Sequence, residues 1–251
     1  MAASSAIEWT DATWNPVTGC TKVSEGCAHC YAERMARRLQ AMGQPNYANG
    51  FAVTTHEHAL RLPGTWKRPC RVFVNSMGDL FHEEVPQEFI RRVFATMERA
   101  PQHRYQILTK RSGRLAELGP SLPWPDHVWM GVTVESARHV DRIEDLSRCG
   151  AAVKFVSFEP LLGPVEDAPL TSVDWAIVGG ESGPGARPME TDWVLSLRDQ
   201  CMQAGVPFFF KQWGGVNKKK AGRVLDGRTW DAMPAACRGP QACHRTHEHA
   251  G

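Results

Sequence analysis

The chain has 251 residues, 42% of them hydrophobic, which is enough to bury a core in one large domain and excludes a disordered or collagen-like protein. Its 29 lysine and arginine residues nearly balance its 27 acidic residues, so contact with nucleic acid would require a local basic patch. No apolar run reaches the roughly 18 residues of a membrane span, and the N-terminus lacks the pattern of a secretory signal. We therefore expect a cytoplasmic protein without membrane contact.

Three cysteines lie close together near the start of the chain. Cys20, Cys27 and Cys30 have the spacing C-x6-C-x2-C, and two glycines in the segment let this loop fold around a ligand. Apolar residues then recur every three or four positions over residues 31–42, which predicts an amphipathic helix. The loop thus precedes a helix N-terminus, where the helix dipole favours negatively charged thiolates.

The number of thiols limits the kind of centre that this loop can hold. A structural zinc ion normally has four protein ligands, and a cubane iron–sulfur cluster prefers four cysteines. His29 lies between two of the cysteines and cannot easily turn toward the same ion. Three thiolates on a cluster would leave one iron open, so we predict a reactive metal centre. A zinc site completed by His56, His58 or a partner protein is one alternative, and three unligated thiols are another.

Two segments depart from the regular alternation of elements. The insertion at residues 43–69 is too long for a plain connection, and we predict that it forms a lid. Residues 235–251 lack apolar periodicity and are predicted to be a flexible tail, where Cys237, Cys243 and nearby histidines could bind metal. Residues 1–234 are predicted to form a single domain.

Strand-length apolar runs alternate with helical patterns along the rest of the chain. Strands are predicted at 71–75, 105–108, 128–133, 153–157, 175–178 and 207–210, and helices at 86–99, 136–146 and 192–203. Nearly continuous apolar strands are typical of parallel sheets that are buried on both faces. The alternation predicts βαβ units in an α/β fold, a complete or partial (β/α) barrel of six to seven parallel strands. An open doubly wound sheet is the alternative.

Polar residues follow every one of these predicted strands. They are Asn75, Ser76 and Asp79, then Thr109 and Lys110, Thr133 and Glu135, Ser157 and Glu159, Glu181 and Ser182, and Lys211 and Gln212. Each of them alone fits a loop residue or a helix cap. Together, at the carboxyl ends of parallel strands, they predict one functional mouth of a barrel.

Seven motifs of this sequence carry a resemblance to a known family. They are Trp14–Cys20, Asn75–Phe81, Leu108–Arg111, Gly131–Glu135, Phe158–Gly163, Gly179–Gly183 and Phe210–Gly214. With them, residues 8–234 resemble a phage-associated family of three-cysteine proteins of unknown function. That family is related to the radical S-adenosylmethionine enzymes, including spore photoproduct lyase, so the resemblance implies a barrel similar to theirs.

The resemblance also implies a cofactor and a chemistry. By it, Cys20, Cys27 and Cys30 would hold a [4Fe-4S] cluster whose open iron binds S-adenosylmethionine. Reductive cleavage of that cofactor, with an electron from a donor, would give a 5′-deoxyadenosyl radical. The cofactor-binding residues would be Asn75, Ser76 and Asp79 for the methionine part and Thr133 and Glu135 for the ribose, and the catalytic residues would be Glu159, Glu181 and Lys211.

Two features depart from the pattern of the superfamily. Its commonest cysteine spacing is C-x3-C-x2-C, whereas this chain has C-x6-C-x2-C. The superfamily usually has a Gly-Gly-Glu segment after the second strand, which holds the amino group of the cofactor. Here the segment from Asn75 to Asp79 stands in its place.

Two groups of basic residues lie near the predicted mouth. One consists of Lys110, Arg111 and Arg114, and the other of Lys218, Lys219 and Lys220, with Lys211, Trp213 and Arg223 nearby. Charge runs are usually solvated surface, but cations beside a mouth could also hold a phosphate backbone. Since the resemblance extends loosely to spore photoproduct lyase, which acts on DNA, we predict a nucleic acid substrate, in repair or modification.

Two other functions are compatible with the same residues. The protein could be a non-catalytic iron–sulfur or zinc-binding protein that works with a partner, because its relatives resemble proteins encoded beside a three-Cys-motif partner protein. It could also be a zinc protein that uses the carboxylates of the mouth for hydrolysis.

Overall fold

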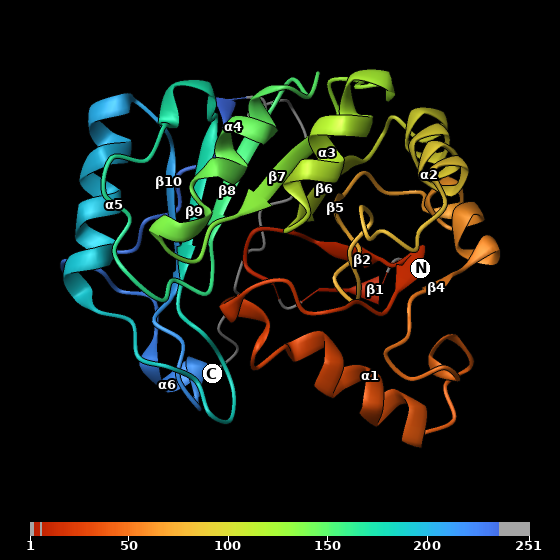
Figure 1. Cartoon of the computed structure of the whole chain (residues 1–251), viewed down its shortest axis with the longest axis horizontal. Coiled ribbons are helices and arrows are strands. Elements are labelled where there is room, and N and C mark those ends of the chain that lie inside the picture. Colours follow the sequence, from red (N-terminus) through yellow and green to blue (C-terminus); the bar gives the residue numbers. More distant parts are fainter. Residues whose placement is uncertain (1–2, 6, 236–251) are drawn as a thin grey trace, which may run out of the picture.

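The structure is a computed structural model that describes residues 3–5 and 7–235 of the chain. Its main feature is a sheet whose strands follow the order β1-β2-β5-β6-β7-β8-β9-β10 and curl into a half-barrel (Figure 1). Every neighbouring pair from β2 to β10 is parallel, and only β1 (Ala3–Ser4) runs antiparallel. Each new strand adds to the same edge, whereas a doubly wound sheet reverses its order at a switch point. The predicted partial barrel is therefore confirmed.

Six of the seven parallel strands lie where the sequence predicts them, within a few residues. The seven are β2 (Ala12–Trp14), β5 (Arg71–Val74), β6 (Arg104–Thr109), β7 (Val128–Thr133), β8 (Lys154–Phe158), β9 (Trp175–Gly179) and β10 (Phe208–Gln212). The strand absent from our prediction is β2, which has only three residues and so carries no clear pattern of its own.

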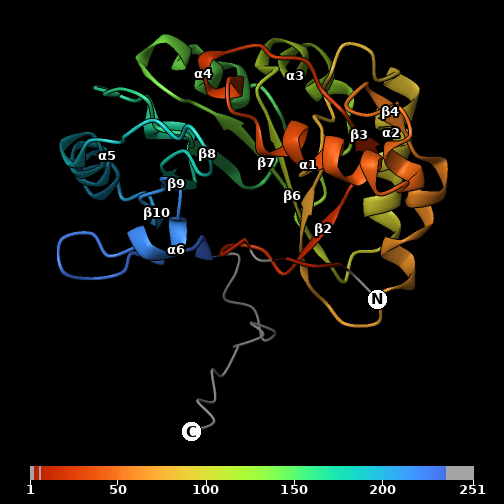
Figure 2. The same cartoon turned by 90° about the horizontal axis from the view of Figure 1, so that it is seen from below.

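Four helices cover the outer face of the sheet (Figures 1 and 2). They are α2 (Gln87–Arg99), α3 (Ser112–Leu118), α4 (Asp141–Ser147) and α5 (Thr191–Ala204). The predicted helix at 136–146 is a 3₁₀ helix, η6 (Ala137–His139), followed by α4. Helix α1 (Tyr31–Ala41) stands apart from these four helices, directly after the cysteine loop, and α6 (Lys218–Ala221) is a single turn near the end of the described chain.

The two faces of the curved sheet have different cores. Successive side chains of a strand point to opposite faces, and the outward set of apolar residues packs with the helices in the larger core. The inward residues near the amino ends of the strands are aromatic. The ring of Trp175 contacts those of Trp9, Trp129 and Phe209 at centroid distances of 6.1, 6.2 and 5.9 Å. All of these strands start at the same end, so the rings fill the amino-terminal half of the interior.

Toward the carboxyl ends of the strands, the inner face becomes small and polar. The positions that continue the inward alternation are Gly131, Thr133, Ser157, Gly179 and Lys211. The lack of a side chain at Gly131 is required, because a Cβ atom there would lie 2.5 Å from the ring of Phe155. The carboxyl half of the interior can therefore offer polar groups to a ligand.

The insertion at residues 43–69 is folded against the start of the chain. Its strand β4 (Thr54–Thr55) pairs with β3 (Val17–Thr18), and it continues into the 3₁₀ helices η3 (Glu57–Arg61) and η4 (Pro63–Thr65). The indole of Trp14 donates a hydrogen bond of 2.9 Å to the carbonyl of Ala59 within it. The tail at 236–251, with Cys237 and Cys243, lies outside the described residues. None of the helices in the described part of the chain combines the length and the apolar character that a membrane crossing needs.

Candidate metal centre

The three cysteines of the loop line one cavity. Cys20, Cys27 and Cys30 are free, half-buried thiols, and all three face a cavity of about 260 Å³. Thr21, Lys22, Glu33 and Phe51 complete its lining. Glu33 is the one other acidic residue of the lining, and it is paired with Arg37 and Lys22. A larger cavity, of about 540 Å³, lies between η3 and α2 and has none of the cysteines in its lining.

The donor groups near the cavity concern the kind of centre that the loop could hold. Within residues 3–5 and 7–235, no three histidine, cysteine or acidic side chains lie close enough together to hold one metal ion. His56 is also turned away, since its Nε2 lies 2.8 Å from the hydroxyl of Thr18. The three thiols around the cavity are therefore the residues that could hold a metal centre.

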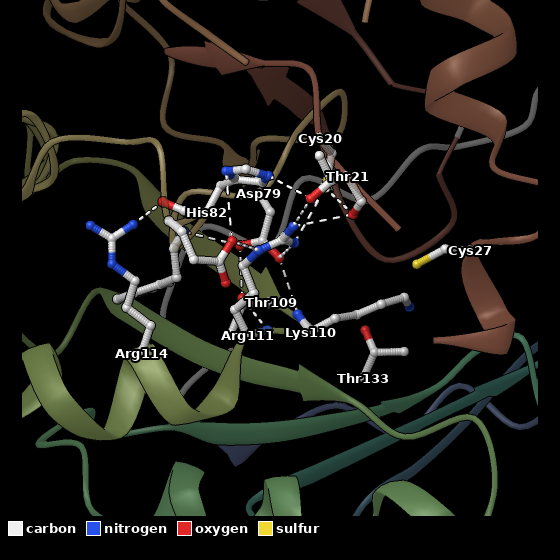
Figure 3. Close-up of polar contacts among 12 residues, drawn as sticks. Cys20, Thr21, Cys27, Asp79, His82, Thr109, Lys110, Arg111, Arg114 and Thr133 are labelled. Carbon is white, nitrogen blue, oxygen red and sulfur yellow. Dashed lines mark hydrogen bonds and ion pairs between the residues drawn. The ribbon is translucent and has the colours of Figure 1, made fainter. Parts of the chain in front are cut away.

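The first part of the loop is held by the buried guanidinium of Arg111, which lies between Asp79 and the loop (Figure 3). Its Nη1 donates to Sγ of Cys20 at 3.3 Å, and its Nη2 donates to the carbonyl of Thr21 at 3.1 Å. Burial, together with the negative charge of Asp79, raises the pKa of the Cys20 thiol to about 11, although Arg111 acts in the opposite direction. At 3% side-chain exposure, Arg111 cannot belong to the basic surface patch that we predicted.

The middle of the loop rests on the carboxylate of Glu135, which is fully buried. The hydroxyl of Ser24 donates to its Oε1 at 2.6 Å, Lys110 Nζ lies 3.1 Å from the same oxygen, and Arg142 donates to its Oε2 at 2.8 Å. Burial alone would raise the pKa of Glu135, but the charges of Lys110 and Arg142 lower it. Lys110 thus points inward rather than into a surface patch, and Glu135 is already occupied by donors of its own chain.

The last part of the loop is held by Glu181 and Arg187. Nδ1 of His29 lies 3.0 Å from Glu181, and Arg187 donates to the same carboxylate and also to the carbonyl of Glu25. Burial would raise the pKa of Glu181, but the hydrogen bonds from Arg187 and His29 lower it to about 2. Glu25 in turn bonds His139 at 2.8 Å, and this bond lowers the pKa of Glu25 to about 2.

Two of the predicted catalytic residues have no part in holding the loop. Lys211 Nζ donates to both oxygens of Glu159, at 2.6 and 2.8 Å. Their side chains are 13% and 19% exposed, and Gly179 lies beside them, with its ideal Cβ position 3.4 Å from the Glu159 carboxyl. This pair joins the ends of β8 and β10 at the polar half of the interior.

The remaining predicted cofactor residues follow β5 (Asn75 and Ser76) or end β7 (Thr133). Ser76 donates to the side chain of Asn15 at 3.2 Å, and Thr133 is buried. Asn75 accepts a bond from the amide of Val17, and its own side-chain Nδ2 is buried without a hydrogen-bond partner among the residues that the structure describes. Its backbone has a φ of 60°, a conformation that asparagine tolerates better than most residues. Asn75 is therefore the predicted cofactor residue that keeps an unused donor.

Sequence reasoning named five of the residues that anchor the loop but gave them other roles: Asp79, Lys110, Arg111, Glu135 and Glu181. It missed Arg142 and Arg187, because each reaches its carboxylate from six or seven residues further along the chain, with no periodic pattern to mark the contact. The inward direction of Lys110 did have a signal in the sequence. This residue continues the inward alternation of Gln106 and Leu108 on β6, so its side chain points into the half-barrel.

Comparison with known proteins identifies the family of the chain but no activity. No match was found among curated proteins or among solved structures. The family described as "Protein of unknown function (DUF5131)" matches residues 4–234, which span the whole half-barrel and the cysteine loop. The chain therefore belongs to the DUF5131 family.

Proposed function

We propose that Cys20, Cys27 and Cys30 hold a [4Fe-4S] cluster and that the protein is an iron–sulfur enzyme of the radical S-adenosylmethionine type. One observation carries this proposal: three free thiols share a cavity beside the carboxyl ends of parallel strands. When bound there, such a cluster supplies one electron for the reductive cleavage of S-adenosylmethionine at its open iron.

The residues of the chain have separate tasks in this proposal. Asp79 with Arg111, Glu135, and Glu181 with Arg187 hold the loop over the ends of the strands. Asn75 has an unused amide donor that suits the carboxylate of the cofactor. We assign Asp79, Glu135 and Glu181 to positioning rather than to direct contact with cofactor or substrate, because their oxygens already accept bonds from the chain.

The pair of Glu159 and Lys211 is the part of the predicted machinery that remains for the substrate. A mostly buried ion pair contributes little to stability once its desolvation is counted, so its presence at the mouth favours a functional role. Lys211 Nζ can hold a proton for a substrate oxygen or nitrogen, and Glu159 can accept one. A nucleic acid remains our proposed substrate class. Because Lys110 and Arg111 point inward, the proposal for nucleic acid rests on the basic sequence at 218–220.

Anaerobic reconstitution with iron and sulfide tests the proposal. We expect a brown protein with about four irons per chain that cleaves S-adenosylmethionine when dithionite is added. Replacing any one of Cys20, Cys27 and Cys30 by serine should abolish cluster binding. Cys70→Ser is the matched control, since Cys70 is a half-buried free thiol outside the cavity. A stable cluster without cleavage would support a non-catalytic module, and stoichiometric zinc would contradict the proposal.

The role of the Glu159 and Lys211 pair needs its own variants. Glu159→Gln and Lys211→Met should leave cluster content and reductive cleavage of S-adenosylmethionine unchanged. We expect both variants to lose turnover of an oligonucleotide substrate, and we expect Lys211→Met, which removes a positive charge, to weaken the binding of single-stranded DNA or RNA oligonucleotides. Unchanged oligonucleotide binding and unchanged turnover in both variants would remove the pair from the substrate site.

A further inference from the structure

The guanidinium of Arg111 makes a contact that is unusual for a buried arginine, because one of its acceptors is a thiol sulfur. All three of its side-chain nitrogens are engaged (Figure 3). Nε donates to Glu83 at 2.8 Å, Nη1 to Sγ of Cys20 at 3.3 Å, and Nη2 to the carbonyl and the hydroxyl of Thr21 at 3.1 and 2.9 Å. One side chain thus fixes both the sulfur and the backbone at the start of the cysteine loop.

Arg111 is itself held rigidly by the end of β6. Its backbone amide donates to the hydroxyl of Thr109 at 2.9 Å, and that hydroxyl donates to Asp79 at 2.7 Å. Asp79 also accepts the amide of Lys110 at 3.2 Å and lies 3.3 Å from Nη1 of Arg111. The end of β6 therefore orients the guanidinium, and its position does not depend on a bound ligand.

The three cysteines differ in this respect. Cys20 has a cationic donor at its sulfur, whereas Sγ of Cys27 contacts the neutral hydroxyl of Ser24 at 3.7 Å. Cys30 has no hydrogen bond to its sulfur from any residue that the structure describes. Of the charges around Arg111, Glu83 is 64% exposed and so is screened by water, which leaves Asp79 as its buried counter-charge.

We propose that Arg111 is a positioning residue that holds Cys20 in place as a ligand and raises the reduction potential of the cluster bound by the loop. The second half of this inference rests on the proposed function. Hydrogen bonds to ligand sulfurs are among the factors that set the potential of an iron–sulfur cluster. A fixed positive charge at one sulfur stabilises the reduced form, which carries one more negative charge than the oxidised form.

Three variants separate the charge of Arg111 from its geometry. Arg111→Met removes both, and Arg111→Lys keeps the charge but cannot reach sulfur and carbonyl together, because an ammonium group is a single point of charge. Arg114→Met is the matched control. Arg114 lies three residues further on, and it donates to the carbonyls of His82 and Val85 rather than to a cysteine.

The first measurement uses protein without a cluster, so it does not depend on the proposed function. Arg111 lowers the pKa of the Cys20 thiol, and only the thiolate reacts, so alkylation by iodoacetamide is followed by mass spectrometry over a range of pH. The rate constants of the Cys20 and Cys27 thiolates, corrected for their degree of ionisation, are then compared within each variant. Loss of the charged hydrogen bonds should free the start of the loop and speed the alkylation of Cys20 about tenfold to a hundredfold relative to Cys27 in Arg111→Met. Arg111→Lys should show a smaller increase and Arg114→Met none. An unchanged ratio in Arg111→Met would overturn the positioning role.

The second measurement is a redox titration of the reconstituted proteins. In Arg111→Met we expect reduction to become about tenfold less favourable, which corresponds to a potential lower by about 59 mV for a one-electron couple. Arg111→Lys, which keeps the charge, should stay near the wild-type potential. An equal potential in wild type and Arg111→Met would overturn the tuning role. If the wild-type protein takes up no cluster, the proposed function fails, whereas the alkylation ratio still decides whether Arg111 holds Cys20.

Discussion

Gly26 lies at the point where the cysteine loop meets the buried carboxylate of Glu135, and its replacement by alanine tests how the loop is held. A Cβ atom at this position would lie 2.5 Å from Oε1 and 2.6 Å from Cγ of Glu135. Glu135 cannot move aside, because Lys110 and Arg142 fix its carboxylate at 3.1 and 2.8 Å. The loop must therefore move away, and the bond between Ser24 and Glu135 must lengthen or break.

The size of the effect follows from these contacts. Forcing an extra carbon into a packed site costs about 1–3 kcal/mol. Loss of the Ser24 hydrogen bond to a charged group is of similar size, about 1.5–3 kcal/mol, but the two changes relieve each other and do not add. We expect the free energy of unfolding to fall by about 1–3 kcal/mol. For a domain of this size, that corresponds to a decrease in Tm of about 2–12 °C.

Thermal unfolding and hydrogen exchange measure the two parts of this prediction. The Tm of Gly26→Ala should fall, and the amides of residues 20–30 should exchange faster than in the wild type. Gly64→Ala is the control, since no atom lies within 4 Å of its ideal Cβ position. If Gly26→Ala keeps both the Tm and the slow exchange of the loop, then Glu135 does not hold the loop in the way described.

Three further substitutions test the interior and the mouth. Trp175→Ala removes a fully buried ring and should lower the free energy of unfolding by about 3–5 kcal/mol in a urea titration. Gly131→Ala should cost about 1–3 kcal/mol in the same assay, because its Cβ would meet the ring of Phe155; equal stability would mean that this ring can shift freely. Glu181→Gln tests the dependence of stability on pH. The pKa of Glu181 falls from 4.5 to about 2 on folding, because the hydrogen bonds from Arg187 outweigh the effect of burial. The ionised carboxylate therefore stabilises the fold above pH 4.5, and this contribution is lost as the pH falls toward 2. The stability of the wild type should therefore decrease more steeply than that of the variant over this pH range, and parallel curves would refute the assignment.

The sheet could be predicted from the sequence to the extent that its strands are long and buried. The strand at 128–133 agrees with β7 at both ends, because all six of its residues are buried and its apolar run is unbroken. The three residues of β2 and the seven of α3 were missed, since elements this short show less than two full periods of any pattern. The βαβ alternation predicted parallel strands but left two strand orders open, that of a barrel and that of a doubly wound sheet.

The candidate site was predictable only in outline. Parallel strands bring their carboxyl ends to one edge, so the meeting of Asp79, Glu135, Glu159 and Glu181 around one mouth could be expected. The residue that pairs with each carboxylate could not be predicted. Arg187 lies six residues after Glu181 in the same connection. Their contact depends on the conformation of that loop, and a loop leaves no periodic pattern in the sequence from which it could be predicted.

The arrangement of charges at the mouth determines which substitutions can report on function. Removal of one member of a buried ion pair leaves an unpaired charge and costs about 3–5 kcal/mol, even where the pair itself adds little stability. Alanine at Asp79 or Glu135 would therefore disturb the loop and the fold together, and a loss of activity in such variants would not identify a catalytic role. The pair of Glu159 and Lys211 is mostly buried as well, but it has no bond to the cysteine loop among the contacts of the described chain. A double variant, Glu159→Gln with Lys211→Met, leaves no charge unpaired, so loss of turnover with intact cluster content and Tm would assign this pair to the reaction.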